Sequence, residues 1–418
     1  MRFLSRFAVP PVGFLTVAQA RLALANRDLA RQAGGTYAVR FDDIDHDDAG
    51  SAERIRQHLR WLGIDWDAEF HQSERAALYA HAIGKLKEAR RLYPCFENED
   101  ELRTKRERRV RVGKSPIYDR AMLKLTPAQR AAAEGNGKLP YWRFLLSGGE
   151  VSWKEASGER QQLKLSTLSD PVLLWADGGV HPTLASAIDD IELGISLLAR
   201  GADEVANSAI QYDIRAALGA NPGAIALSHL PALVDATRGK RARTLEKLTI
   251  RQLRHDGIEA EALAAYLRGL GADPRFDSAV LLERNRKILA DCPFDDVKDR
   301  LPEGADAAFW QAVRGHIDLL PEAWQWWAIA RGEIVPPILD GAAIILSTSY
   351  ATMPEEPWHD GTWSVWLAVL GTQTDQPDAI LLRLALTGEE AGPPMDQILP
   401  LIGRARVERR LRGVMRVG

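Results

Sequence analysis

The chain has 418 residues, of which 46% are hydrophobic and 27% are charged, and its formal net charge is −3. These values are typical of a globular protein with two or three domains, and the charge balance gives no support to nucleic-acid binding. The apolar runs are short and broken by charge, which excludes a membrane-spanning protein.

The N-terminal segment lacks the order of basic, apolar and small residues that marks a secretory signal, so a cytoplasmic protein is expected. The only two cysteines, Cys95 and Cys292, are then expected to be thiols. No cysteine or histidine cluster has the spacing of zinc ligands, so no structural metal is expected.

The first 45 residues predict a strand, a helix and a second strand. Residues 2–9 are extended and end at Pro10, residues 15–33 follow an alanine-rich helical pattern, and residues 36–41 are β-branched and aromatic. Such a unit favours a doubly wound parallel sheet, with a ligand crevice at the carboxyl ends of its strands.

The rest of the chain divides by pattern. Residues 50–95 are expected to be helical, residues 100–170 mix helix and short strands like an insertion, and residues 172–219 return to an α/β pattern. From residue 251 the pattern is nearly all helical, and six tryptophans are expected to fill helix–helix contacts there. They are Trp324, Trp326, Trp327, Trp358, Trp363 and Trp366.

Eight sequence blocks stand in the order found in glutamyl-tRNA synthetases, and the chain resembles that class I family over essentially its whole length. The family opens with RFAPSPTGxLHVGGARTAL and continues with R-[IF]-[ED]-D-T-D, WLGLDWD, QSxR and VDDxxLGITHVIRGEDH. The matching segments here are residues 6–24 (RFAVPPVGFLTVAQARLAL), 40–45 (RFDDID), 61–66 (WLGIDW), 72–75 (QSER), 189–201 (DDIELGISLLARG), 229–231 (HLP), 384–388 (LALTG) and 401–403 (LIG).

The resemblance implies a Rossmann-like doubly wound catalytic domain with an insertion, followed by an all-helical C-terminal region like an anticodon-binding domain. Residues 1–95 and 171–235 would be the two halves of the Rossmann-like domain, and residues 96–170 an insertion like that which contacts the acceptor stem. Residues 236–310 would be a helical stem-contact region and residues 311–418 the anticodon-binding-like domain. The implied reaction is the attachment of glutamate to tRNA with ATP and Mg²⁺.

The groups with which such enzymes stabilise charge on ATP are altered in this chain. The HIGH-type motif supplies imidazole donors and a bare glycine at the start of the first helix. Here Thr16 stands at the first histidine and Ala18 at the glycine. Glu204 stands at the end of the RGEDH block, where a carboxylate beside the nucleotide would repel a triphosphate. The catalytic positions are therefore degenerate.

The KMSKS-type loop corresponds to residues 238–245. Ala242 replaces the serine and Arg243 the key lysine, and arginine is not equivalent to a mobile lysine. Lys240, Arg241 and Arg243 are the expected nucleotide-binding residues of this loop.

The glutamate pocket that the resemblance implies retains some of the family's residues and lacks others. Arg6, Asp42 and Arg200 occupy the family's positions for the charged groups of the substrate, whereas Pro10 and Pro182 stand at a serine and a tyrosine. Proline has no side-chain donor to replace them. The two arginines either bind a ligand carboxylate or pair with an aspartate at the crevice, such as Asp42, Asp43 or Asp203.

Other candidates have structural interpretations. Asp189 and Asp190 are expected to brace the fold, Cys95 to be buried packing, and His181 to be a lone loop histidine. Residues 103–114 and 404–412 are rich in arginine and lysine, but a charge run is usually a solvated helix face. Residues 371–378 carry acid and glutamine where the family is basic, so weak tRNA binding is expected.

Two hypotheses follow. The first is a pseudo-synthetase, which keeps the scaffold, lacks ATP-dependent activation of glutamate and serves a binding or regulatory role toward a protein partner, tRNA, or glutamate or a related carboxylate. The second is an active glutamate–tRNA ligase, or a related carboxylate-activating ligase. The concentration of losses at the ATP motifs favours the first.

Overall fold

The computed structural model describes residues 4–44, 49–155, 158–236, 245, 247–271, 274–335, 337–339 and 341–417. Its chain forms two compact units, Met1–Arg251 with Leu267–Phe276 (unit 1) and Gln252–Tyr266 with Asp277–Gly418 (unit 2). No helix in this described part is long and apolar enough to cross a membrane. The finer five-part division stays a prediction.

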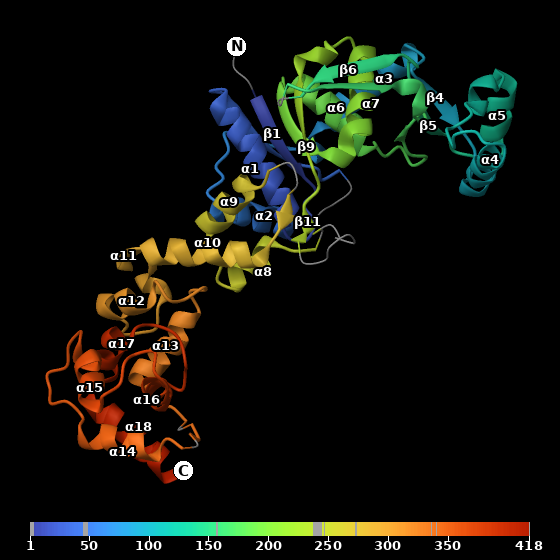
Figure 1. Ribbon diagram of the computed structural model, residues 1–418. Helices are drawn as coiled ribbons and strands as arrows, with labels where there is room; N and C mark the ends of the chain where they lie inside the picture. Colours follow the sequence, from blue (N-terminus) through green and yellow to red (C-terminus); the bar gives the residue numbers. More distant parts are fainter. Residues whose placement is uncertain are drawn as a thin grey trace. The chain divides into compact units, whose positions relative to one another are not determined.

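A five-stranded parallel sheet forms the centre of unit 1, in the order β10-β9-β1-β2-β3. Figure 1 labels its neighbouring strands β1 and β9. The pairing of β1 with β2 runs in register from Leu4↔Thr36 to Val9↔Phe41, which confirms the predicted strand–helix–strand unit. The strands are β1 (Leu4–Val9), β2 (Thr36–Phe41), β3 (Ala68–His71), β9 (Leu197–Gly201) and β10 (Ala226–Leu230).

The strand order places a topological switch point between β1 and β9. The chain leaves β1 toward β2 and β3 on one side, and β9 and β10 add on the other. Connections that diverge in this way leave a crevice at the carboxyl ends of the two central strands. Helix α1 (Val17–Gln32) packs against β1, β2 and β9, and Gly34 follows its end with φ +64°, a conformation that glycine adopts without strain.

The prediction that residues 50–95 are helical is wrong in part, because two strands lie within that range. β3 adds to the parallel sheet, and β4 (Leu92–Cys95) pairs with β5 (Tyr141–Phe144) in a separate antiparallel sheet that also contains β8 (Val172–Leu174). Both strands are only four residues long, too short for a period-two pattern to stand out beside α2 (Ala49–Trp61) and α3 (Ala76–Glu88).

The predicted insertion carries two helices and a hairpin. Figure 1 shows α4 and α5 beyond β4 and β5, at the end of unit 1 away from α1. Cys95 is fully buried, as expected, and burial raises the pKa of its thiol to about 12. The elements are α4 (Glu99–Arg111), α5 (Pro127–Gly135), β6 (Glu150–Lys154) and β7 (Arg160–Lys164).

The second half of unit 1 returns to strand and helix. Helix α6 (Pro182–Glu192) lies against α7 (Val205–Ala217), and α7 connects β9 to β10. Two short strands, β11 (Val234–Asp235) and β12 (Arg275–Phe276), pair in parallel. The chain passes between the two units within α8 (Ile250–His255) and α9 (Ala260–Gly269).

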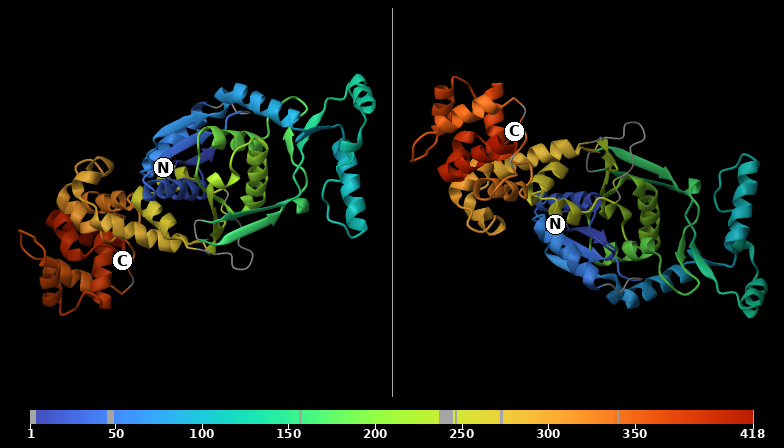
Figure 2. Two further views of the ribbon diagram at one scale, coloured as in Figure 1. Left: turned by 90° about the horizontal axis from the view of Figure 1, so that it is seen from above. Right: turned by 90° about the horizontal axis from the view of Figure 1, so that it is seen from below.

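Unit 2 is helical from α10 onward, as predicted, and Figure 2 shows its C-terminal helices gathered around one another. Trp326, Trp363 and Trp366 are buried in its core, but Trp324 is 55% exposed, so the packing prediction is wrong for that residue. The helices are α10 (Ser278–Asp291), α11 (Phe294–Val297), α12 (Ala307–Val313), α13 (Glu322–Arg331), α14 (Ala343–Ala351), α15 (Thr362–Leu370), α16 (Pro377–Thr387), α17 (Met395–Ile402) and α18 (Arg404–Val417).

Candidate functional site

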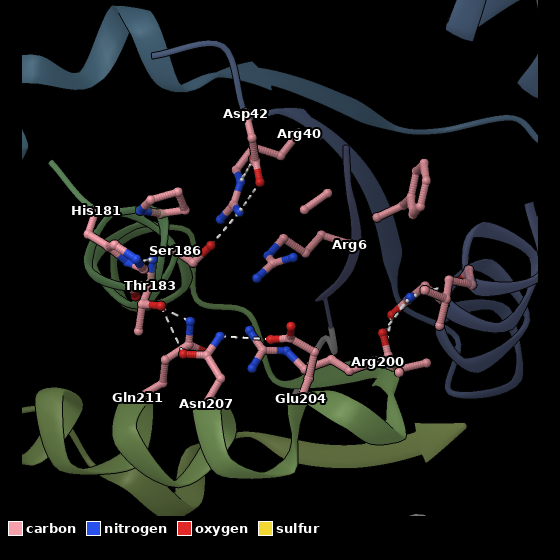
Figure 3. A pocket seen from close by; sticks show the side chains of 17 residues that line it. Arg6, Arg40, Asp42, His181, Thr183, Ser186, Arg200, Glu204, Asn207 and Gln211 are labelled. Atoms are coloured by element: carbon pink, nitrogen blue, oxygen red, sulfur yellow. Dashed lines mark hydrogen bonds and ion pairs between the residues drawn. The ribbon is translucent and has the colours of Figure 1, made fainter. Parts of the chain in front are cut away.

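A cavity of about 400 Å³ opens at the carboxyl ends of β1, β2 and β9, between α6 and α7. The three predicted substrate-binding residues, Arg6, Asp42 and Arg200, all line this first cavity. Figure 3 shows that α6 and α7 contribute a second set of polar side chains to it. They are His181, Thr183, Ser186, Glu204, Asn207 and Gln211.

Arg6 is already paired within the protein. Its Nε lies 2.5 Å from Asp190 Oδ1 and its Nη2 lies 2.9 Å from Asp190 Oδ2, and both side chains are buried. Burial alone would raise the pKa of Asp190, but the charge and hydrogen bonds of Arg6 lower it below the ordinary value. The predicted pairing of Arg6 with Asp42, Asp43 or Asp203 is therefore wrong, because the partner comes from α6.

Arg40 forms an ion pair with Asp42 in the same way. Its Nε donates to Asp42 Oδ1 at 2.7 Å, and its Nη2 donates to Ser186 Oγ at 2.6 Å. Burial alone would lower the pKa of Arg40, but Asp42 and the buried Asp189 and Asp190 raise it above the ordinary value. Asp42 thus faces the cavity as a carboxylate that a cation already compensates.

Asp189 and Asp190 brace the interior, as the sequence suggested. Asp189 accepts hydrogen bonds from Gln72, Arg75 and Tyr79, and no part of it is exposed. With Asp190 bound by Arg6, neither carboxylate is left to do acid–base work.

Arg200 differs from the other arginines of the first cavity. Its Nη1 donates to Ser208 Oγ at 3.1 Å, and among the described residues no carboxylate oxygen lies within 4 Å of its guanidinium. Burial and the charge of Arg6 lower the pKa of Arg200 to about 10, although Asp190 and Glu204 act in the opposite direction. It stays a cation near neutral pH, and among the three arginines that line the first cavity it is the one without an ion-pair partner in the described residues.

His181 lies in the loop before α6, as expected, and it also lines the first cavity. It forms the N-cap of α6, where its Nδ1 accepts from Thr183 N at 3.2 Å, and burial lowers the pKa of its imidazole. Pro182 follows at the first helical position and also lines the cavity. Proline is favoured there because the first turn of a helix needs no intrahelical N–H.

Sequence reasoning missed the polar face that α7 turns toward the first cavity. Glu204, Asn207 and Gln211 follow one another at spacings of three and four, so they share one face of a helix. Glu204 accepts from Asn207 Nδ2 at 2.7 Å, and Gln211 donates to the Thr183 carbonyl at 3.2 Å. This helical spacing of polar residues was the available signal.

A second cavity of about 380 Å³ adjoins the first, since Leu22 and Gly201 line both. Ala18 and Asp203 line it, whereas Glu204 lines the first cavity. That Ala18 and Glu204 lie beside a nucleotide stays a prediction. The other lining residues are Arg21, Leu230, Pro231, Ala232, Leu233 and Leu245.

The polar groups at the start of α1 are used within the protein. Thr16 and Gln19 form a capping box, in which Gln19 N donates to Thr16 Oγ1 at 3.2 Å and Thr16 N donates to Gln19 Oε1 at 2.9 Å. Val17 N donates to the Leu248 carbonyl and Ala20 N to the Thr16 carbonyl, both at 2.9 Å. Three of the first four amides of this helix are therefore occupied, which weakens it as an anion site.

The predicted nucleotide-binding residues Lys240, Arg241 and Arg243, with Ala242, lie outside the described residues. Arg21, which lines the second cavity, donates through Nη1 to the Pro231 carbonyl at 2.6 Å, and burial lowers its pKa. Within the described ranges, no group of three histidine, cysteine or acidic side chains could hold a metal ion.

The two basic runs are mostly engaged or solvated. Helix α4 buries none of its residues, as a solvated face would, and its Arg103 pairs with Asp100. In α18 each arginine of the run has an internal partner. Arg404 pairs with Glu355, Arg406 donates to the Ile402 carbonyl, Arg409 pairs with Glu333, Arg410 donates to the Leu386, Ile329 and Gly332 carbonyls, and Arg412 pairs with Glu408.

Comparison with known proteins gives consistent matches. The family described as tRNA synthetases class I (E and Q), catalytic domain, matches residues 3–289. A glutamate–tRNA ligase 2 from Gluconacetobacter diazotrophicus is 45% identical over 97% of this chain and 98% of its own length. One of the same name from Granulibacter bethesdensis is 45% identical over 97% of each chain.

Solved structures support the fold. The structure of a glutamate tRNA ligase from Elizabethkingia meningosepticum in complex with its amino acid aligns with a TM-score of 0.80 at 17% identity, covering 100% of this chain and 99% of the other. The glutamate-tRNA synthetase from Elizabethkingia anophelis aligns with a TM-score of 0.81 at 18% identity, covering 100% of both chains. The α/β fold with a parallel sheet and a helical C-terminal region is thereby confirmed.

Proposed function

The chain belongs to the class I tRNA synthetases for glutamate and glutamine, and from that premise we propose that it is a pseudo-synthetase: a glutamyl-tRNA synthetase-like protein that binds a carboxylate ligand but does not activate it with ATP. The observation that carries this proposal is the contrast between Arg200, whose charge is open to the first cavity, and the start of α1, whose polar groups are occupied. A cytoplasmic location goes with the proposal.

The ligand side rests on Arg200. A ligand carboxylate would meet a half-buried guanidinium that has no carboxylate partner among the described residues, and charge-assisted hydrogen bonds of this kind are among the strongest in proteins. Asp42 and Glu204 line the same cavity, and although Arg40 and Asn207 already donate to them, a carboxylate can accept a further hydrogen bond from the ammonium group of an amino acid. Glutamate or a related amino acid is therefore the proposed ligand, and the binding or regulatory role follows from its capture without turnover.

The loss of activation rests on Thr16 and Ala18. Adenylate formation transfers a nucleotidyl group to the ligand carboxylate, so donors and cations must already face the phosphates. Thr16 carries no charge, and its hydroxyl is tied to Gln19. Ala18 adds a methyl group to the wall of the second cavity.

The experiment is pyrophosphate exchange into ATP, measured with L-glutamate, Mg²⁺ and glutamate-accepting tRNA. We expect no exchange above background, because the loss of even one preplaced donor costs about a hundredfold in rate, roughly 3 kcal/mol. A glutamate–tRNA ligase run in parallel shows that the assay works. Exchange at a rate near about one per second would overturn the pseudo-synthetase proposal and make Lys240 and Arg243 the first residues to mutate.

A separate measurement tests the ligand. L-glutamate at about 10 mM should raise the melting temperature of the wild type, and Arg200→Met should abolish the rise. Arg27→Met is the matched control, because Arg27 lies on the outer surface of α1 and pairs with Asp65. An equal rise in Arg200→Met and in the wild type would place binding elsewhere.

A second candidate, an active glutamate–tRNA ligase, is favoured by one observation. The relatives that are 45% identical over nearly the whole chain carry that activity in their names. ATP and Mg²⁺ would then be its co-substrate and cofactor, and tRNA its partner. Weak tRNA binding remains our proposal, because the arginines of α18 are held internally.

A further inference from the structure

Arg200 faces His229 across two neighbouring strands. β9 and β10 are parallel, and their register pairs Arg200 with His229 directly. Residues paired in this way point to the same face of the sheet. The crossover helix α7, which joins these two strands, carries Ser208 on that face, so the fold brings three polar side chains together from residues 200–229 alone.

The hydrogen bonds that link these three side chains continue to a fourth side chain, that of Glu155. Ser208 Oγ lies 3.1 Å from Arg200 Nη1 and 2.9 Å from His229 Nε2, and His229 Nδ1 lies 2.7 Å from Glu155 Oε1. Ser208 is 1% exposed, and the side chains of His229 and Glu155 are 6% and 7% exposed. Water therefore has little access to compete for these hydrogen bonds.

The donor and acceptor properties of the four side chains set the direction of this hydrogen-bond chain. A guanidinium can only donate, so Arg200 donates to Ser208 Oγ, and the serine hydrogen is then available to His229 Nε2. A neutral imidazole that accepts at Nε2 carries its hydrogen on Nδ1, which donates to the Glu155 carboxylate. Each of the three hydrogen bonds then has one donor and one acceptor, and the tautomer of a neutral His229 follows from this arrangement.

The far end of the chain is fixed to the backbone and to an aromatic ring. Glu155 Oε2 accepts from His229 N at 2.9 Å, and its Oε1 accepts from Trp153 Nε1 at 2.7 Å. Trp153 belongs to β6 of the insertion and is 5% exposed. Among the described residues the hydroxyl of Ser208 is the one hydrogen-bond acceptor that holds the Arg200 guanidinium, so the position of this cation depends on the chain behind it.

We propose that Ser208, His229 and Glu155 are positioning residues, which hold the Arg200 guanidinium in the first cavity so that it meets the carboxylate of the ligand. This inference rests on the proposed function for the ligand, but the position of Arg200 can be measured without any ligand. An arginine held in place loses less rotamer freedom on binding, which favours affinity.

The test compares Ser208→Ala, Ser208→Thr and the matched control Ser349→Ala, which removes a fully buried serine hydroxyl of unit 2. Ligand-free crystal structures should show the Arg200 guanidinium displaced in Ser208→Ala and in its wild-type place in the other two. Calorimetry with L-glutamate should show Kd raised about tenfold or more in Ser208→Ala and restored to within about threefold in Ser208→Thr.

A spectroscopic signature separates positioning from packing. Imidazole ¹⁵N shifts should show His229 with its hydrogen on Nδ1 in the wild type, and Glu155→Leu, which removes the acceptor, should change that tautomer. An Arg200 guanidinium that keeps its place in Ser208→Ala, or unchanged glutamate affinity in that variant, overturns the inference. Wild-type protein that binds no glutamate overturns the proposed ligand, while the crystal structures still decide the role of Ser208.

Discussion

The first cavity and the start of α1 both adjoin strand β1, yet they differ in which polar groups lack a partner within the protein. Around the first cavity three arginines approach one space, and internal carboxylates compensate Arg6 and Arg40 but not Arg200. At the start of α1, Thr16 and Gln19 satisfy each other, and neighbouring backbone carbonyls take further amides. The first cavity therefore presents a charged guanidinium to a ligand, whereas most polar groups at the start of α1 are already hydrogen-bonded.

The difference shows that a shared scaffold does not imply a shared capacity. Both regions keep the strand and helix positions expected of the family. What separates them is whether each polar group has a partner within the chain, because a group that is already hydrogen-bonded gains little from a ligand. A retained fold in which three of the first four amides of α1 are occupied is consistent with the pseudo-synthetase proposal.

Arg6→Met tests the ion pairing around the first cavity, and of the variants considered it should lower the free energy of unfolding most. Removing one partner of a buried ion pair leaves Asp190 with only the more distant Arg40, whose Nη1 lies 3.7 Å from Oδ1, so the free energy of unfolding should fall by up to about 3–5 kcal/mol. Urea denaturation measures this loss. The double variant Arg6→Met/Asp190→Leu, which removes both charges, should recover most of it, and equal destabilisation of the two variants would contradict the buried-pair explanation.

The same pair should make stability depend on pH in a predictable direction. The pKa of Asp190 is lower in the folded protein than in the unfolded chain, so its contribution is full above the unfolded value, about 3.9, and is lost as the pH falls through the folded value. Below about pH 4 the wild type should therefore lose stability more steeply than Arg6→Met/Asp190→Leu, by up to about 1.4 kcal/mol per pH unit.

Urea denaturation at several pH values between about 2 and 7 measures the two slopes. Other carboxylates with lowered pKa, such as Asp43 and Glu69, are present in both proteins, so the difference isolates the Arg6–Asp190 pair. Parallel curves for the two proteins would contradict the prediction.

Thr16→Ala tests the capping interactions at the start of α1, and it should lower the free energy of unfolding least. If the hydroxyl serves as a helix cap, its loss costs about 1 kcal/mol of unfolding free energy. Thr126→Ala is a matched control, because Thr126 forms the same capping box on α5, which buries none of its residues. Its effect on global unfolding should be smaller, and a loss in Thr16→Ala no greater than in Thr126→Ala would argue against a structural role for Thr16.

Much of the fold followed from the sequence. The strand at residues 36–41, the helix before it and the parallel pairing with the first strand were predictable, because β-branched and alanine-rich runs each favour one periodicity. The order of the sequence blocks placed Arg6, Asp42 and Arg200 at one crevice, and the structure brings them to one cavity. Their proposed role in binding substrate still awaits experiment.

Only the tertiary structure decided which arginine remains available. Arg6 meets Asp190 across 184 positions in the sequence, and Glu155 meets His229 across 74, so no local pattern could have paired them. The charges of Arg6 and Arg200 look equivalent in the sequence, but burial makes an uncompensated charge costly, and among the described residues only Arg6 has a carboxylate, Asp190 of α6, within ion-pair distance. Residue identity set the charges present, and the geometry of the folded chain determined which of them a ligand can use.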